Sequence, residues 1–140
     1  MIAIACDHGG YELKLQIIKY LEKEGLEYTD FGCNGESVDY PIYAQKVGRA
    51  IQNGECEKGI LICGTGIGIS IAANKMPGIR CALCSDCFSA EATRLHNNTN
   101  VVALGGRVIG PELAVKIVDT WLNTPFSNDE RHIRRIDMLE

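Results

Sequence analysis

The segment best suited to chemistry is Cys63 together with the glycine-rich turn that follows it at residues 64–68. An apolar run at 59–63 precedes the turn and an apolar helical pattern follows it, so the turn joins a strand to a helix. Backbone amides at a helix N-terminus bind anions and would stabilise a Cys63 thiolate. This arrangement suits a general base or nucleophile beside an oxyanion. A cysteine that only ends a buried strand is an equally good interpretation of the position alone.

The turn itself favours a small anion over a nucleotide. Thr65 either offers its hydroxyl to an oxyanion or caps the following helix. A dinucleotide fingerprint that begins at Gly64 and Gly66 requires glycine at position 69, where the chain has Ile69. No Lys-Ser or Lys-Thr pair completes a P-loop either. A nucleotide site is therefore the weaker interpretation.

Two more loops carry polar side chains that suit a site. Asp7 and His8 follow the apolar run at 1–6 and precede two glycines, although Asp7 alternatively caps a helix while His8 faces solvent. His96 and Asn97 end a helical pattern and begin a polar run, although a histidine there is often only a partner of the helix dipole. We expect both loops at the same edge of the sheet as Cys63, where ligands of such folds bind.

Three arginines mark the last predicted helix. Arg131, Arg134 and Arg135 are spaced i, i+3 and i+4, which predicts one shared helix face. Like charges held together destabilise a helix, so a bound phosphate is a natural reason for the cluster. The alternative is a solvated face that Asp129, Glu130 and Asp137 partly neutralise.

Composition limits the class of protein. The 140 residues carry a net charge of -4, which argues against general binding to nucleic acid or to an acidic membrane. No apolar run approaches the length of a membrane span, and the N-terminus does not resemble a signal peptide. Seven cysteines, an odd number, predict reduced thiols in the cytoplasm.

The spacing of Cys81, Cys84 and Cys87 imitates part of a metal or iron–sulfur motif. A fourth ligand is missing nearby. An offset of three places Cys81 and Cys84 on opposite faces of one strand. We therefore expect core cysteines and no metal site.

Apolar runs alternate with helical patterns along the chain, which predicts βαβ units in a parallel sheet. The predicted strands are 1–6, 26–31, 59–63, 79–84 and 101–104. The predicted helices are 11–24, 41–53, 69–75, 86–95, 111–122 and a last one over 129–139. The expected fold is a single domain over 1–140: a three-layer αβα, Rossmann-like, doubly wound five-stranded parallel sheet with an extra C-terminal helix.

Four segments, at 6–10, 39–41, 62–75 and 96–101, together resemble the ribose-5-phosphate isomerase B family, which includes the galactose-6-phosphate isomerase subunits. Residues 106–108 and the pattern Arg131-His132-x-x-Arg135 extend the resemblance to the C-terminus. The resemblance implies interconversion of D-ribose 5-phosphate and D-ribulose 5-phosphate through an enediol, with no metal or cofactor. Family members are homodimers or dimers of dimers whose sites are shared between subunits.

The resemblance also implies residue roles. Cys63 would move the proton between C1 and C2, because Ile69 stands where some members have a glutamate. His96 would open the sugar ring, and Tyr43 would face the site or pack in the core. The implied substrate-binding residues are Asp7, His8, Gly64, Thr65, Gly66, Ile67, Gly68, Asn97, Arg107, Arg131 and Arg135. A six-carbon substrate (allose 6-phosphate or galactose 6-phosphate) and a non-catalytic nucleotide-binding module stay open as alternatives.

Overall fold

The sheet has five parallel strands in the order β2-β1-β3-β5-β4. The computed structural model describes all 140 residues. The strands are β1 (Ile2–Cys6), β2 (Tyr28–Asp30), β3 (Lys58–Cys63), β4 (Cys81–Leu83) and β5 (Val101–Gly105). The predicted α/β class and the number of strands are confirmed.

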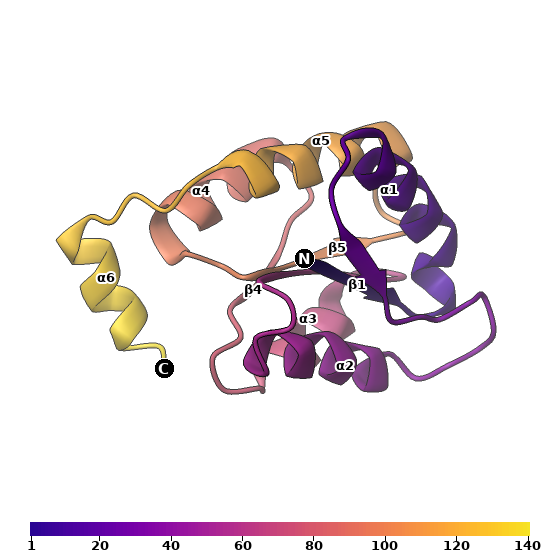
Figure 1. Cartoon of the computed structure of the whole chain (residues 1–140), viewed down its shortest axis with the longest axis horizontal. Helices are drawn as coiled ribbons and strands as arrows, with labels where there is room; N and C mark the ends of the chain where they lie inside the picture. Colours follow the sequence, from indigo (N-terminus) through magenta and orange to yellow (C-terminus); the bar gives the residue numbers. More distant parts are fainter.

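Helices cover both faces of this sheet. They are α1 (Tyr11–Lys23), α2 (Tyr40–Gln52), α3 (Ile67–Asn74), α4 (Cys87–Asn97), α5 (Pro111–Asn123) and α6 (Glu130–Asp137), with a 3-10 turn, η1, at His8–Gly10. Helices α1, α4 and α5 form one outer layer, α2 and α3 form the other, and α6 stands apart beyond the end of α4 (Figure 1). The three layers and the extra C-terminal helix are as predicted.

The sequence explains where several helices begin and end. Pro41 and Pro111 occupy the first turns of α2 and α5, where a missing amide proton costs nothing. The Asp86 carboxylate caps α4, because its Oδ1 accepts the backbone N–H of Ser89 at 2.6 Å. Gly25, at φ 68°, follows the end of α1 in the left-handed conformation that glycine adopts most easily.

Alternate residues of the central strands supply the two halves of the core. Ile60 and Ile62 pack toward α1 and α5, whereas Leu61 and Cys63 pack toward α2 and α3. Cys84 belongs to the first half and Cys81 lies against the second. The two thiols therefore lie on opposite sides of the sheet, as predicted, and all seven cysteines are free.

One charged pair is part of this core. The Lys14 side chain on α1 is fully buried, and its Nζ lies 2.8 Å from the Asp30 Oδ1 at the end of β2. The same ammonium group donates a hydrogen bond of 2.6 Å to the carbonyl oxygen of Cys33. The pair joins α1 to the segment that follows β2.

None of the six helices combines the length and the apolar content that a membrane span requires.

Candidate active site

Three loops meet beyond the carboxyl ends of β1, β3 and β5. Glycines allow the approach: a Cβ atom on Gly106 would lie 2.5 Å from the carbonyl oxygen of Gly9, and one on Gly9 would lie 2.9 Å from the amide nitrogen of Gly64. The backbone N–H of Arg107 donates to the carbonyl oxygen of Gly64 at 2.9 Å. We call Asp7, His8, Cys63, residues 64–68 and Arg107 the carboxyl-edge cluster.

Cys63 ends β3 inside this cluster and is buried. Its Sγ accepts the backbone N–H of Gly66 at 3.1 Å, and Gly66 has a φ of 79° that favours glycine. The amides of Gly64 and Thr65 make no hydrogen bond within the chain. The turn thus holds a thiol beside amide groups that are free to bind an oxyanion.

The Thr65 hydroxyl accepts the N–H of Ile67, the first residue of α3, at 3.1 Å, whereas the N-cap position of this helix is Gly66. A hydroxyl that accepts one hydrogen bond can still donate its own proton to another partner. The contact of the Thr65 hydroxyl with an oxyanion stays a prediction.

Asp7 and His8 lie where β1 enters η1. The buried Asp7 carboxylate accepts the N–H of Gly9 at 2.9 Å and caps this turn. The exposed His8 ring accepts the N–H of Val38 at its Nδ1, at 3.3 Å. A neutral His8 ring therefore carries its proton on Nε2, where it can donate to an anion.

His96 and Asn97 do not lie at this edge, and our expectation for them is wrong. The backbone N–H of Gly59, at the start of β3, donates to the carbonyl oxygen of Asn100 at 2.8 Å. The polar run at 96–100 is therefore at the amino ends of the strands, about 13 Å along β3 from Cys63 at 3.3 Å per residue. The reason is general: a crossover helix runs antiparallel to the strands, so α4 starts at the carboxyl edge and ends at the amino edge.

The ends of α4 and α6 enclose a separate cavity of about 420 Å³. We call it the helix-end cavity; its lining residues are His96, Asn97, Arg131, His132, Arg135, Ile136 and Leu139. It gathers four of the predicted site residues around a strongly basic opening.

Arg134 is the exception among the three arginines. It lies on the outer side of α6 beside Ile133 and Met138, away from Arg131 and Arg135. Each residue advances a helix by about 100°, so Arg134 and Arg135 point about 100° apart. The predicted single arginine face is therefore wrong for Arg134.

Two residues near the candidate site were not predicted. The His132 ring is buried, and its centroid lies 4.6 Å from that of His96. The Tyr40 ring lies over Gly68, where a Cβ atom would be 2.5 Å from the ring. Tyr43 packs against Gly32 and both halves of the core, which agrees with the core alternative. The motif around Arg131 contained His132, but no pattern indicated that its ring is buried.

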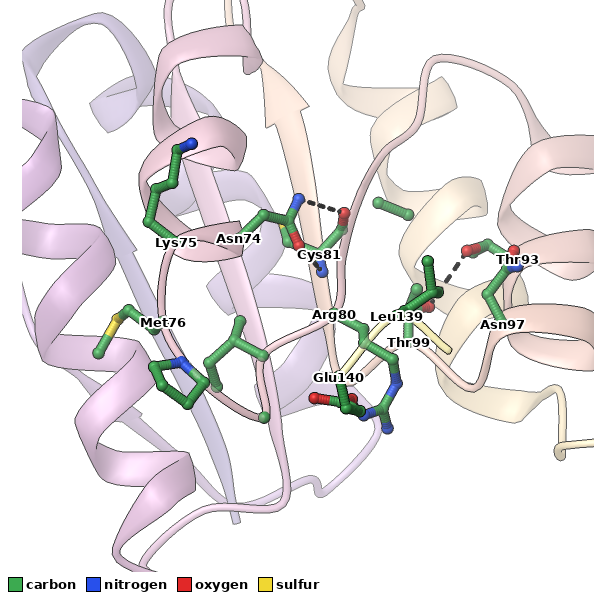
Figure 2. Close-up of a pocket in the computed structure, with 14 residues that line it drawn as sticks. Asn74, Lys75, Met76, Arg80, Cys81, Thr93, Asn97, Thr99, Leu139 and Glu140 are labelled. Atoms are coloured by element: carbon green, nitrogen blue, oxygen red, sulfur yellow. Dashed lines mark hydrogen bonds and ion pairs between the residues drawn. The ribbon is translucent and has the colours of Figure 1, made fainter. Parts of the chain in front are cut away.

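A larger cavity of about 550 Å³ adjoins the helix-end cavity and shares Asn97 and Leu139 with it. Arg80 and the C-terminal Glu140 lie side by side at its rim (Figure 2), and their closest side-chain atoms are 2.6 Å apart. The Arg80 guanidinium also donates to the carbonyl oxygen of Asn98 at 2.9 and 3.1 Å. Arg80 therefore ties the C-terminus to the polar run beside His96.

No three His, Cys, Asp or Glu side chains come together as a metal site would require.

Comparison with known proteins gives one consistent family. Residues 2–139 match the family model described as Ribose/Galactose Isomerase. The chain is 50% identical over 139 residues to the ribose-5-phosphate isomerase B of Escherichia coli, covering 99% of this chain and 93% of that one. It is 48% identical over 127 residues to a D-erythrulose-4-phosphate isomerase of Pectobacterium atrosepticum, covering 89% and 84%. The solved ribose-5-phosphate isomerase B of Clostridium thermocellum superposes with a TM-score of 0.96 at 52% identity, covering 99% and 93%.

Proposed function

Because the chain belongs to the ribose/galactose isomerase family and is an isomerase, we propose that it interconverts D-ribose 5-phosphate and D-ribulose 5-phosphate, with Cys63 as the base. The observation that carries the proposal is the Cys63 thiol at the mouth of a turn whose Gly64 and Thr65 amides have no other partner. A phosphorylated sugar fits the basic character of the arginines near both groups of residues.

The chemistry follows from this geometry. The Cys63 sulfur, as thiolate, removes the proton from C2 of the open-chain aldose, and the electron pair moves onto the carbonyl oxygen at C1. The resulting enediolate accepts hydrogen bonds from the amides of the 64–68 turn and from Thr65. A proton then passes from the hydroxyl at C2 to O1, and return of the carbon-bound proton from the sulfur to C1 leaves the carbonyl at C2. Charge that exists only along this path is stabilised, which is the condition for a faster reaction.

A complete site needs a second copy of the chain. The carboxyl-edge cluster and the helix-end cavity lie at opposite ends of the strands, so one subunit cannot present both to one sugar. A two-fold axis perpendicular to the strands reverses their direction and brings the carboxyl edge of one subunit beside the amino edge of its partner. Asp7, His8 and Arg107 then come from one subunit, and His96, Asn97, Arg131 and Arg135 come from the other.

Exposed apolar side chains beside β4 support this homodimer. Ile67 and Ile71 on α3, Leu83 on β4 and Phe88 on α4 are between 43% and 81% exposed. Apolar side chains clustered on a surface mark protein contacts. Ile67 belongs to the carboxyl-edge cluster and the other three lie on neighbouring elements, so the partner subunit that covers them would sit beside this cluster.

Mixing two inactive variants tests the shared site. When Cys63→Ala and His96→Asn chains are refolded together in equal amounts, about half of the dimers are mixed, and each mixed dimer has one intact site of two. Aldose-to-ketose activity should therefore return to about a quarter of the wild-type value. A mixture as inactive as its parents would place each site within one chain, and mixed Cys63→Ala and Cys63→Ser chains serve as the inactive control.

Removal of one arginine tests the phosphate contact. Arg135→Ala should raise KM about tenfold or more with little change in kcat, since a charge-assisted hydrogen bond to phosphate acts in the ground and transition states alike. Steady-state kinetics measure both constants. Arg134→Ala, on the outer side of the same helix, is the matched control and should leave KM unchanged. An unaltered KM in Arg135→Ala would remove this residue from the phosphate site.

The substrate is decided by a panel of sugar phosphates. We expect the purified chain to turn over ribose 5-phosphate in preference to allose 6-phosphate and galactose 6-phosphate. Erythrulose 4-phosphate belongs in the panel because a relative at 48% identity is named for it. Stabilisation by nucleotides without turnover of any sugar phosphate would favour the binding-module alternative.

The seven unpaired cysteines support a reducing compartment, which we take to be the cytoplasm.

A further inference from the structure

His132 is a buried titratable group that the proposed reaction does not use. It is 8% exposed, whereas the neighbouring His96 on α4 is exposed. The two ring planes are inclined by 42° and their centroids are 4.6 Å apart. The His96 side chain makes no hydrogen bond within the chain, and the His132 ring is the aromatic group that lies against it.

The position of His132 is itself fixed. Its Nδ1 lies 2.7 Å from the Ser127 hydroxyl, and that hydroxyl accepts the backbone N–H of Asp129 at 3.1 Å. The hydroxyl proton is free to point at Nδ1, and in that arrangement a neutral His132 carries its proton on Nε2. The N–H of Ser127 donates to the carbonyl oxygen of Leu95 at 3.2 Å, directly before His96. One short chain of hydrogen bonds thus sets α6 against the end of α4.

The surroundings of His132 favour its neutral form. Burial lowers its pKa below the ordinary value, and the nearby His96 lowers it further. Arg131 and Arg135 act in the same direction, while Asp129 opposes them. A neutral His132 places no positive charge beside the His96 ring.

We propose that His132 is a positioning residue that holds the His96 imidazole in the orientation needed to open the sugar ring. This inference rests on the function proposed above, in which His96 acts on the cyclic sugar. It adds a residue to that step and predicts that His132 matters for one direction of the reaction only.

The direction follows from the chemistry of the two sugars. Ribose 5-phosphate exists mainly as a furanose, and opening removes the proton of the O1 hydroxyl, forms the C1=O1 bond, breaks the C1–O4 bond and returns a proton to O4. Ribulose 5-phosphate cannot close a furanose ring, because its O5 carries the phosphate. The aldehyde formed from ribulose 5-phosphate closes in solution after release. Ring opening therefore limits only the aldose-to-ketose direction.

Initial rates in both directions test the proposal with His132→Phe, which keeps a flat ring against His96 but has no nitrogen. The initial aldose-to-ketose rate, measured with enough enzyme that spontaneous opening of the free furanose is slower than turnover, should fall about tenfold or more, because general acid–base catalysis supplies roughly 10²–10⁴-fold and a misplaced ring keeps only part of it. The ketose-to-aldose rate should change by less than about threefold, since proton transfer by Cys63 does not depend on His96. Equal losses in both directions, or no loss, would overturn the proposal.

Two further variants make the result decisive. Ser127→Ala keeps both imidazoles and removes only the hydrogen-bond partner of the His132 Nδ1, so it should show the same directional bias. If His132→Phe does not fold, Ser127→Ala alone decides the question. An equal loss of rate in both directions in Ser127→Ala would overturn the proposal. Ile133→Ala, an exposed neighbour on α6, should match the wild type in both directions. A wild-type chain that turns over neither pentose phosphate overturns the proposed function, and this inference falls with it.

Discussion

The Cys63→Ala variant should lose isomerase activity in both directions by about 10³-fold or more, since a general base contributes roughly 10²–10⁴-fold and no second base stands in the turn. Ile69, in the first turn of α3, occupies the position at which the resemblance would offer a carboxylate. Ribose 5-phosphate should still bind, because the amides and arginines do not depend on the sulfur. Steady-state kinetics measure the loss, and calorimetric titration measures the binding.

A matched control separates the chemistry of this thiol from its packing. Cys56 is also a buried free cysteine, but it lies before β3, far from the carboxyl-edge cluster. Cys56→Ala should therefore keep full activity. Cys63→Ser, which keeps a group of similar size, should be nearly as inactive as Cys63→Ala, because an alcohol is a far weaker acid than a thiol. Wild-type rates in Cys63→Ala would refute the assignment of the base.

The Asp30→Ala variant should destabilise the fold by about 3–5 kcal/mol, the usual cost of leaving a buried charge without its partner. The Lys14 ammonium has 1% of its side chain exposed, so solvent cannot replace the lost carboxylate. The Asp30 Oδ1 also accepts the backbone N–H of Gly32, which the variant leaves unpaired. Urea unfolding at neutral pH measures the change in the free energy of unfolding.

Removing both charges provides the control for this prediction. In the double variant Lys14→Met with Asp30→Ala, no unpaired charge is left in the core, and the methionine side chain fills most of the lysine volume. It should be more stable than Asp30→Ala alone by about 1 kcal/mol or more, because an apolar replacement of a buried pair is often close to neutral. A double variant less stable than Asp30→Ala would show that Lys14 stabilises the fold mainly through its bond to the Cys33 carbonyl.

Elements with strong local patterns could be predicted from the sequence. Pro41, Pro111, Asp86 and Gly25 act through their own backbone or their nearest neighbours, so the helix limits they imply are close to those observed. The strands predicted at 26–31 and 79–84 are shorter in the structure, at Tyr28–Asp30 and Cys81–Leu83. Both are edge strands with a single neighbour, and the length of such a ladder depends on a partner that lies far away in the sequence.

The candidate site could be predicted in its parts but not in its arrangement. The cluster of Asp7, Cys63 and Arg107 follows from strand ends that must share one edge of a parallel sheet. The expected position of His96 was wrong because a residue at the end of a crossover helix lies at the amino edge of the sheet. The role expected for His96 in a site gave no information about the edge at which α4 ends. The burial of His132 depends on how α6 folds back on α4, a tertiary contact that leaves no local pattern.

The order of the strands also has a consequence for synthesis on the ribosome. Strand β5, the last to be made, lies between β3 and β4, and β4 has no other strand partner. A nascent chain can pair β1, β2 and β3 once residue 63 has emerged, but β4 stays without its partner until residues 101–105 follow. A chain released before that point leaves open the side of β3 that β5 would cover, and an unpaired strand edge recruits other chains. For this protein, interrupted translation therefore yields an aggregation-prone fragment rather than a smaller stable domain.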